Sequence, residues 1–380
     1  MKKIYLDYNA TTPVAPSVLE VMQPFFMEHF GNPSSSHSFG RAAAEAIEDA
    51  RGKVAGMINS NPDEIVFTSG GTEANNLALK GALLKTTGGI PGGHLIISSI
   101  EHPAITAPAR FLERLGIDLT IVPCDSQGIV DPDEIRSAIR PDTVLVSVMH
   151  SNNEVGSLQL IEEISQICRE HEVLIHTDAS QSCGKVPVDV RQLQVDMLTM
   201  ASHKFYGPKG VGALYLCSGV ALEPFMHGAG HEKGLRAGTE NTPYIAGMGA
   251  AAKLVGQAVG ESREKLAEFR DTLLNRLKEE IPGLIVNAER AAKLPNTLSV
   301  SFPGVSALEI LSRVPELSAS TGAACHSNTE DSSTLEAMGV SEEIMRGTIR
   351  LSVGWYTNQE ELERASNLLI DAWENLHQPA

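Results

Sequence analysis

The sequence predicts an α/β protein with a large domain built on a mainly parallel seven-stranded sheet and a smaller α+β domain. Short β-rich runs alternate with helical patterns from about residue 60 to residue 216, which is the rhythm of parallel βαβ units. A long helical pattern, rich in alanine and charged pairs, then runs from Pro243 to about Lys278. A second, smaller group of strand patterns follows and closes the chain.

The large domain is expected to contain seven strands joined by crossover helices. Apolar residues recur at three- and four-residue spacing in "EANNLALKGALL" and "IEEISQICREHE", so these segments are expected to be helices that cover the sheet. The seven strand patterns are residues 64–69, 94–99, 119–123, 143–150, 173–178, 196–200 and 212–216.

The small domain is expected after the long helix. Its strand patterns are "NTLSVSF", "LSASTG" and "IRLSVGW", with the helical "SALEILSRV" between them and a closing helix at about 359–376. We assign residues 15–260 to the large domain and residues 1–14 and 261–380 to the small one. The small domain also carries a loop of small and polar residues at about 321–335.

Composition and charge exclude several classes of protein. With 380 residues, of which 42% are apolar and 20% charged, the chain can bury a large core. Its net charge of −17 disfavours nucleic-acid phosphates and anionic membranes as partners. The start "MKKIYLDYNATTP" lacks the apolar core of a secretory signal, and no run reaches transmembrane length. We therefore expect a cytoplasmic protein without direct nucleic-acid or membrane binding.

The five cysteines are scattered and odd in number, which fits neither a disulfide framework nor a zinc site. We predict no metal site. Cys325 differs from the others because it lies in "GAACHSNTEDSS", among small and polar residues. An exposed loop thiol is a candidate nucleophile, and the alternative is an incidental surface cysteine. The other four lie in apolar or strand-end contexts and are expected to be inert: Cys124, Cys168, Cys183 and Cys217.

Lys204 and Asp178 both follow apolar strand patterns. Lys204 comes after "DMLTM", where an unpaired ammonium is costly, and Asp178 ends "VLIHTD", where a carboxylate needs a cationic partner. Pyridoxal phosphate would answer both needs, because it condenses with a lysine amine and needs an acid beside its pyridine nitrogen. The alternatives are a lysine that reaches solvent and an aspartate that caps the next turn.

Two further strand ends carry candidate cofactor contacts. In "FTSGGTEANN" a strand ends at Gly70 and Gly71 and a helix begins near Thr72, so the free N–H groups of the helix start can accept a phosphate. Alternatively, the glycines only form a tight βα connection. His102 in "EHPAI" can stack on an aromatic cofactor and transfer protons near neutral pH. Its alternative is a hydrogen-bonded structural histidine.

Arg350 and Asn153 are candidates for binding a substrate carboxylate. Arg350 lies in the strand pattern "IRLSVGW", and its planar guanidinium matches a carboxylate. Asn153, in "HSNNEVG", offers an amide for a carboxylate or a cofactor oxygen. A surface ion pair and a turn asparagine are the respective alternatives.

These residues and their surroundings resemble the cysteine desulfurases and the related selenocysteine lyases, in the class V branch of the fold-type I pyridoxal-phosphate enzymes. The likeness covers nearly the whole chain, and so many motifs in one order are specific. The motifs are "YLDYNATTP", "GNPSSSHSFGR", "FTSGGTEANN", "EHPAI", "NNEVG", "HTDASQ", "SHKFYGPKG", "RAGTENTP", "LPNT", "GAACHS" and "RLSVG".

The resemblance implies a role for each matching residue. Lys204 would hold the cofactor as a Schiff base, His102 would stack on its ring and shuttle protons, and Cys325 would take sulfur from the substrate. Ala201 departs from the pattern, because many relatives have a phosphate-binding serine there. The other implied contacts are Asp178 at the pyridine nitrogen, Gln181 at the phenolic oxygen, Gly71, Thr72, Ser202 and His203 near the phosphate, Thr239 from the other subunit of a homodimer, and Asn153 and Arg350 at the substrate carboxylate.

The function implied is that of a pyridoxal-phosphate-dependent cysteine desulfurase. It would convert L-cysteine to L-alanine and leave a persulfide on Cys325 for a protein sulfur acceptor, for example in iron–sulfur cluster assembly. The alternative is a selenocysteine lyase acting on L-selenocysteine, because the spelling "ACHS" is similar to those enzymes, whereas many desulfurases have threonine after the cysteine. An aminotransferase on the same scaffold would need a keto-acid acceptor and no thiol.

Overall fold

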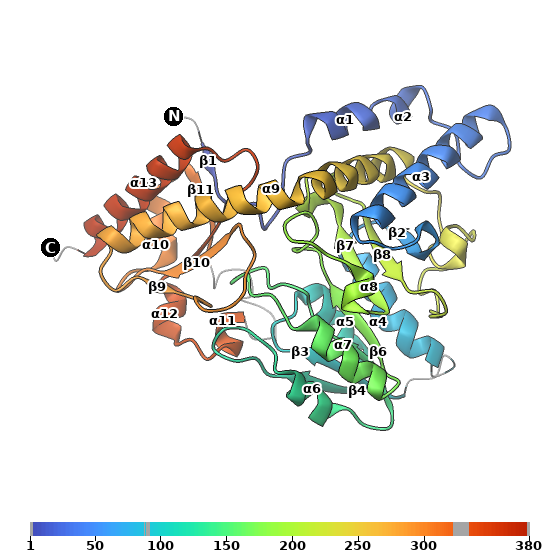
Figure 1. Cartoon of the computed structure of the whole chain (residues 1–380), viewed down its shortest axis with the longest axis horizontal. Coiled ribbons are helices and arrows are strands. Elements are labelled where there is room, and N and C mark those ends of the chain that lie inside the picture. Colours follow the sequence, from blue (N-terminus) through green and yellow to red (C-terminus); the bar gives the residue numbers. More distant parts are fainter. Residues whose placement is uncertain (1–2, 87, 89–91, 322–333, 378–380) are drawn as a thin grey trace.

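A seven-stranded sheet forms the larger part of the molecule, with strand order β2-β8-β7-β6-β5-β3-β4 (Figure 1). The computed structural model describes residues 3–86, 88, 92–321 and 334–377. Within this part of the chain, β8 (Gly212–Leu216) is antiparallel to both neighbours and the other sheet pairs are parallel. The predicted mainly parallel sheet is confirmed. Its other strands are β2 (Ile65–Thr68), β3 (His94–Ser98), β4 (Asp118–Val122), β5 (Thr143–Ser147), β6 (Leu174–Asp178) and β7 (Met197–Ala201).

Helices cover both faces of this sheet, because alternate residues of each strand enter different cores. Ile96 of β3 packs in one core with residues of α3, α7 and α9, whereas Leu95 packs in the other with residues of α4 and α5. Two buried faces explain why the strands read as continuous apolar runs. The covering helices are α3 (Ser38–Met57), α4 (Gly71–Thr86), α5 (Pro103–Arg114), α6 (Pro132–Ala138), α7 (Ile161–Glu170) and α8 (Val190–Leu193).

The smaller part has a four-stranded antiparallel sheet of order β12-β13-β10-β9 and a parallel pair, β1 with β11. The prediction of one strand at 317–322 is wrong. The chain forms two short strands there, because residues 317 and 318 pair with β1 and residues 320 and 321 pair with β13. The elements are β1 (Ile4–Tyr5), β9 (Ile285–Val286), β10 (Thr297–Ser301), α10 (Ala307–Arg313), β11 (Leu317–Ser318), β12 (Ser320–Thr321), α11 (Thr334–Ala337), α12 (Glu342–Arg346), β13 (Thr348–Ser352) and α13 (Gln359–His377).

The long helix α9 (Thr242–Glu280) joins the two parts and runs from beside α13 to beside α3 in Figure 1. Pro243 is near its start, where a missing N–H costs nothing. Residues of α9 up to Val255 pack in the core of the large sheet, and residues from Leu266 onward pack in the core of the small part. The domain limits remain our proposal, and this change of core within α9 is the physical reason for a limit near residue 260.

Two short helices near the N-terminus, α1 (Pro16–Met22) and α2 (Pro24–Met27), were not predicted. They lie beside α9 and lead into α3 (Figure 1). Three 3-10 turns complete the described elements: η1 (Pro62–Glu64), η2 (Ser202–Lys204) and η3 (Glu232–Gly234). Among the described residues, no helix combines the length and the apolar character that a membrane span requires.

Candidate active site

A cavity of about 340 Å³ lies where the carboxyl ends of five strands of the large sheet meet. The segments that follow β2, β3, β5, β6 and β7 all contribute to its lining. A crevice outside the carboxyl ends of parallel strands is the usual ligand position in an open α/β sheet. The cavity brings together eight of the residues predicted from the sequence: Gly71, Thr72, His102, Asn153, Asp178, Gln181, His203 and Lys204.

Four other predicted residues are placed differently. Ser202 is fully buried, and its hydroxyl, which has no hydrogen-bond partner among the described residues, packs against Gly207 rather than lining the cavity. Thr239 lines a separate hollow of about 260 Å³. Arg350 does not line the cavity but contacts it through Asn153, as described below. Cys325 lies outside the described residues.

Lys204 points its amine at the backbone of the N-terminal segment. Its Nζ donates to the carbonyl oxygens of Asn9 at 2.7 Å and Ala10 at 3.0 Å. Burial, and then the positive charge of Arg350, lower the pKa of Lys204 to about 8, because both disfavour the ammonium. The nearby carboxylates oppose this shift. A sizeable fraction of this amine is therefore neutral and nucleophilic near pH 8.

Asp178 is the last residue of β6 and only 8% exposed. Its Oδ2 accepts a hydrogen bond of 2.7 Å from Asn75 Nδ2, and its Oδ1 accepts one of 2.9 Å from the backbone N–H of Ser180. Both donors are neutral, so they orient the carboxylate without cancelling its charge. A carboxylate held in this way favours a protonated nitrogen in a ligand placed before it.

One corner of the cavity can hold a phosphate. The start of the 16-residue helix α4 lies there, with its unpaired N–H groups. A Cβ added at Gly71 would fall 3.2 Å from Ser180 Oγ and 3.3 Å from Ala201 Cβ, so these residues are close neighbours. Ser180 therefore offers a hydroxyl beside Ala201, the position where the sequence departs from the family pattern.

His203 borders the same cavity and is neutral near pH 7. Burial and the positive charge of Lys204 lower the pKa of His203 to about 4. Its Nδ1 lies 3.1 Å from Thr11 Oγ1, which fixes the ring. A neutral imidazole offers a phosphate one N–H donor without adding a further positive charge beside Lys204.

His102 forms the N-cap of α5, and its Nδ1 accepts a hydrogen bond of 3.0 Å from Ala104 N–H. Because Nδ1 is an acceptor, the proton of the neutral ring is on Nε2. The preceding Glu101 is buried and ties the end of β3 to Met149 N–H at 2.7 Å. Burial raises the pKa of Glu101 to about 8. These contacts hold the turn that places His102 in the cavity lining.

Arg350 joins the small sheet to the cavity. Its Nη1 donates to the carbonyl oxygen of Asn153 at 3.0 Å, and its Nη2 donates to Asp7 Oδ1 at 2.8 Å and Ser320 Oγ at 3.0 Å. The Nε of Arg350 is buried and has no hydrogen-bond partner among the described residues. The predicted carboxylate-binding pair is thus in direct contact.

Several site residues were missed by the sequence analysis. Asn75 and Ser180 lie within motifs already quoted. Asn75 reaches Asp178 only because the fold brings α4 to the end of β6, whereas Ser180 contacts Asp178 within one turn. Asn9 is a meeting point, because its backbone oxygen accepts from Lys204 and Gln181 while its side chain contacts the small domain at Asn296. The only sequence signal for Asn9 was its place in the motif "YLDYNATTP", because it does not follow a predicted strand of the large sheet.

The residues that line the cavity fit pyridoxal phosphate. They supply an amine with a lowered pKa, a buried carboxylate whose donors among the described residues are neutral, and a helix start beside a hydroxyl. Lys204, Asp178 and the start of α4 would suit the aldehyde, the pyridine nitrogen and the phosphate of this cofactor respectively. No group of metal-ligating side chains is found among the described residues.

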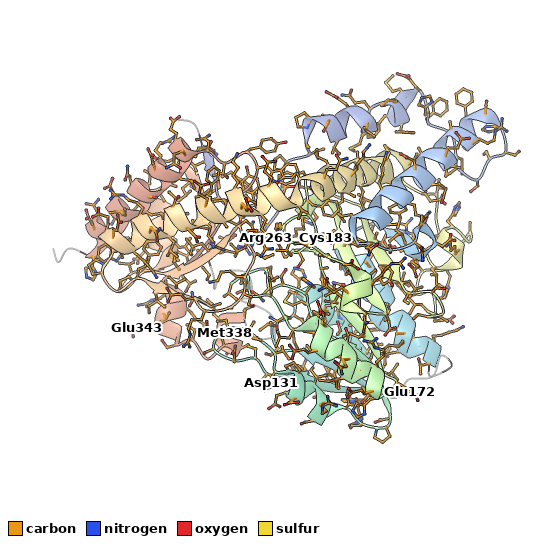
Figure 2. All side chains as sticks on the ribbon, in the orientation of Figure 1. Asp131, Glu172, Cys183, Arg263, Met338 and Glu343 are labelled. Carbon is orange, nitrogen blue, oxygen red and sulfur yellow. The ribbon has the colours of Figure 1, made fainter. Side chains whose placement is uncertain are left out.

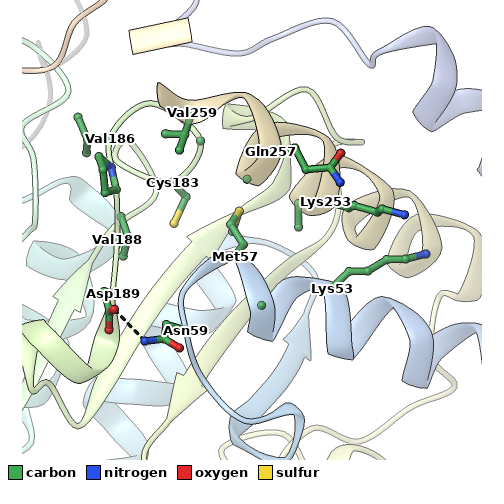
Figure 3. Close-up of a pocket in the computed structure, with 15 residues that line it drawn as sticks. Lys53, Met57, Asn59, Cys183, Val186, Val188, Asp189, Lys253, Gln257 and Val259 are labelled. Atoms are coloured by element: carbon green, nitrogen blue, oxygen red, sulfur yellow. Dashed lines mark hydrogen bonds between the residues drawn. The ribbon is translucent and has the colours of Figure 1, made fainter. Parts of the chain in front are cut away.

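A larger hollow of about 600 Å³ lies elsewhere, between α3, α9 and the segment after β6 (Figure 3). Its lining is mostly apolar, and the side chains of Met57 and Cys183 face into it. Cys183 lies beneath α9 (Figure 2), and burial raises the pKa of its thiol to about 12, so it is inert as predicted. The charged residues that line this hollow, Lys53, Lys253 and Asp189, are partly or fully exposed, and none of them is buried as Asp178 is in the strand-end cavity.

Comparisons with known proteins show which family this chain is similar to. The profile of the family described as Aminotransferase class-V matches residues 4–365. The chain is 44% identical over 371 residues to the cysteine desulfurase IscS of Dictyoglomus turgidum, covering 97% of this chain and 94% of that one. Among solved structures, a NifS-like protein has a TM-score of 0.90 at 36% identity, with 98% and 99% of the two chains covered. SspA in complex with cysteine has a TM-score of 0.82 at 38% identity, with 93% and 100% covered.

Proposed function

Because the chain belongs to the class-V aminotransferase family and is a pyridoxal-phosphate-dependent cysteine desulfurase, we propose that the strand-end cavity is its active site and Cys325 its sulfur acceptor. The observation that supports this most directly is that Lys204 and Asp178 line one cavity, in which the pKa of the lysine amine is lowered to about 8. Neither strand end alone requires a cofactor. Together they match the two opposite ends of one pyridine aldehyde.

Each residue around the cofactor has a proposed task. When bound, pyridoxal phosphate supplies an electron sink for the charge that develops at the substrate Cα. Lys204 would hold the aldehyde carbon, Asp178 would keep a proton on the pyridine nitrogen, and Gln181 would donate to the phenolic oxygen. The start of α4 would hold the phosphate, and its further proposed ligands are Thr72, Ser180 and His203.

The substrate is oriented and deprotonated by residues of this chain. Arg350 and Asn153 bind the α-carboxylate of L-cysteine, which fixes the Cα–H bond relative to the cavity. Lys204 Nζ, or His102 through its ring nitrogen, then accepts the Cα proton. The pKa of about 8 of the unliganded Lys204 suits proton transfer near neutral pH.

Sulfur transfer is assigned to Cys325. Its thiolate attacks the substrate sulfur, the carbon–sulfur bond breaks, and a sulfur–sulfur bond forms on the protein. The three substrate carbons leave as L-alanine after protonation, so L-cysteine and a thiol become L-alanine and a persulfide. The persulfide is then available to a thiol of an acceptor protein, for which the acidic chain suits a basic docking face.

Product analysis with Cys325→Ala tests this assignment. The wild-type protein with a reductant should convert L-cysteine to equal amounts of L-alanine and sulfide, and the variant should lose this activity.

Selenocysteine lyase activity is not favoured by the curated relatives, which are desulfurases. The variant should nevertheless still release selenium from L-selenocysteine, because a selenol is a better leaving group. Undiminished sulfide release by Cys325→Ala would refute the acceptor role, and amino transfer to a keto acid would indicate an aminotransferase instead.

A homodimer is also proposed, with Thr239 acting in the partner's cavity. An apolar patch supports it, since α1, α2, the segment after α2 and the start of α3 expose several large side chains: Leu19, Val21, Phe26, Met27, Phe30 and Phe39. Patches of this kind mark interfaces between proteins. Thr239 lies away from the strand-end cavity of its own chain, as a residue donated to the other subunit would.

Active-site complementation tests the exchange of Thr239. Subunits with Lys204→Ala and subunits with Thr239→Ala are co-expressed with two different affinity tags, and the mixed dimer is purified. If Thr239 serves the partner, the mixed dimer contains one intact site and regains about half of the wild-type activity. If Thr239 serves its own chain, neither site is intact, and the activity does not exceed about half of that of the Thr239→Ala dimer.

A further inference from the structure

Lys185 is a buried lysine that the proposed reaction does not use. It is 6% exposed, and its Nζ donates to Gln181 Oε1 at 2.7 Å and lies 3.4 Å from Asn9 Oδ1. Neither acceptor is a carboxylate. An ammonium without a counter-charge is costly at such a position. A side chain that only filled space would be cheaper if it were apolar, so the amine requires a more specific explanation.

The surroundings of Lys185 favour the neutral form of its amine. Burial, followed by the positive charges of Lys204 and Arg350, sets the pKa of Lys185 well below its usual range, and the thiol of Cys183 opposes this only weakly. These are the titratable groups that act on it. A neutral amine still donates hydrogen bonds, and it adds no further positive charge beside Lys204. Hydrogen bonding rather than charge is therefore what Lys185 contributes.

Two neighbours, Asn9 and Lys185, fix the side-chain amide of Gln181 in the same orientation. The backbone oxygen of Asn9 can only accept, and it lies 2.9 Å from the amide nitrogen of Gln181. Lys185 donates to the other end, the amide oxygen. If the amide were turned around, an N–H group would face the donor Lys185 and an oxygen would face the Asn9 oxygen. One hydrogen of the Gln181 amide nitrogen is used by Asn9, which leaves the second for the cavity that Gln181 lines.

We propose that Lys185 is a positioning residue that locks the Gln181 amide with its N–H group toward the cofactor's phenolic oxygen. This inference rests on the proposed contact between Gln181 and that oxygen. Lys185 does not touch the cofactor itself. It acts by occupying the amide oxygen, so that only the donor end of Gln181 can face the cavity. A donor at the phenolic oxygen stabilises its anionic form and lowers the pH at which the bound cofactor titrates.

The test is the pH titration of the visible absorption band of the cofactor-loaded protein, without substrate. Lys185→Met keeps the volume but removes the donor, so the titration midpoint should rise by about 0.7 pH unit, the equivalent of one ordinary hydrogen bond. Lys185→Gln supplies a neutral donor and should return the midpoint most of the way to the wild-type value. Lys293→Met is the matched control, because burial also lowers the pKa of Lys293, to about 8, but this lysine pairs through its backbone with Ser157 and not with Gln181. Its midpoint should not change.

Gln181→Met separates this inference from the proposed contact on which it rests. That variant should raise the midpoint as Lys185→Met does, and the double variant should show no additional shift, because both changes remove one interaction. An unchanged midpoint in Gln181→Met refutes the contact and, with it, the role of Lys185. A shift in Gln181→Met without one in Lys185→Met refutes the role of Lys185 alone. An equal shift in Lys185→Gln and Lys185→Met shows that charge is what matters and also overturns the inference.

Discussion

Arg350 Nη2 and Asp7 Oδ1 form an ion pair of 2.8 Å, which joins residues from near the two opposite ends of the chain beside the strand-end cavity. Ser320 joins them, because its hydroxyl donates to Asp7 at 2.9 Å and accepts from Arg350 at 3.0 Å. Both charged side chains are largely buried. In the proposed mode of binding, a substrate carboxylate would share the guanidinium of Arg350 with Asp7, and this competition would lower the affinity for the substrate.

The first prediction is that Arg350→Lys weakens substrate binding more than it slows turnover. A lysine cannot contact Asn153, Asp7 and a carboxylate in the fixed geometry of a guanidinium. The loss of one charged hydrogen bond in the ground and transition states should raise KM for L-cysteine about 10- to 100-fold, with kcat changed only a few-fold. Steady-state kinetics of sulfide and alanine formation measure both constants.

Asp7→Asn is the matched variant for the same pair. It keeps an oxygen that accepts from Arg350 but removes the charge that competes with the substrate. KM should therefore stay the same or fall, the opposite of the effect of Arg350→Lys. Equal increases in KM for the two variants would mean that the ion pair only maintains the structure and that the carboxylate binds elsewhere.

The second prediction concerns the pH at which the apo protein captures pyridoxal phosphate. Only the neutral amine of Lys204 reacts, and its pKa is lowered to about 8. The rate of covalent capture should rise about tenfold from about pH 7 to about pH 9 and then level off. A lysine with an ordinary pKa would instead give about a hundredfold rise without a plateau in this range. Stopped-flow absorbance of the visible band measures the rate, and Lys204→Ala should show no such band.

The sequence was sufficient to predict the strand-end residues of the site, for a physical reason. Parallel strands buried on both faces appear as apolar runs, and their carboxyl ends meet at one edge. A polar residue directly after such a run, as with Lys204 or Asp178, is therefore informative before the fold is known. The roles of individual atoms around the cofactor came from the family resemblance instead.

The residues that support this site could not be predicted from local pattern. Lys185 is seven residues beyond the end of β6, and its neighbours in "QSCGKVP" give no sign of a buried amine. Its role depends on the distance to Gln181, which only the folded turn fixes. The division of residues 317–321 into two strands was missed for a similar reason, because β1 and β13, the two partners, are far apart in sequence.

The third prediction concerns stability outside the active site. Arg51 and Glu232 form a buried bidentate pair with N–O distances of 2.8 and 2.7 Å, and Glu232 also accepts from Phe67 N–H at 2.7 Å. Arg51→Leu leaves the Glu232 carboxylate buried without a cation, which should lower the free energy of unfolding by about 3–5 kcal/mol. Urea unfolding measures it. Arg136→Leu, which removes an exposed ion pair with Glu170, is the control and should leave the midpoint nearly unchanged. Similar midpoints for both variants would contradict the prediction.

The fourth prediction is that a charge in the exposed apolar patch of α1, α2 and α3 breaks the proposed homodimer. Met27 is 83% exposed at the end of α2, so Met27→Glu disturbs no core of the single chain. In a dimer that covers this patch, the carboxylate would be buried without a partner, at a cost large enough to favour monomers. Leu308→Glu is the control, because Leu308 is 65% exposed on α10 of the small part. Sedimentation velocity should give a dimer for the wild type and Leu308→Glu but a monomer for Met27→Glu. The monomer should also lose desulfurase activity, because Thr239 no longer reaches a partner's cavity, whereas a fully active monomer would contradict the shared site.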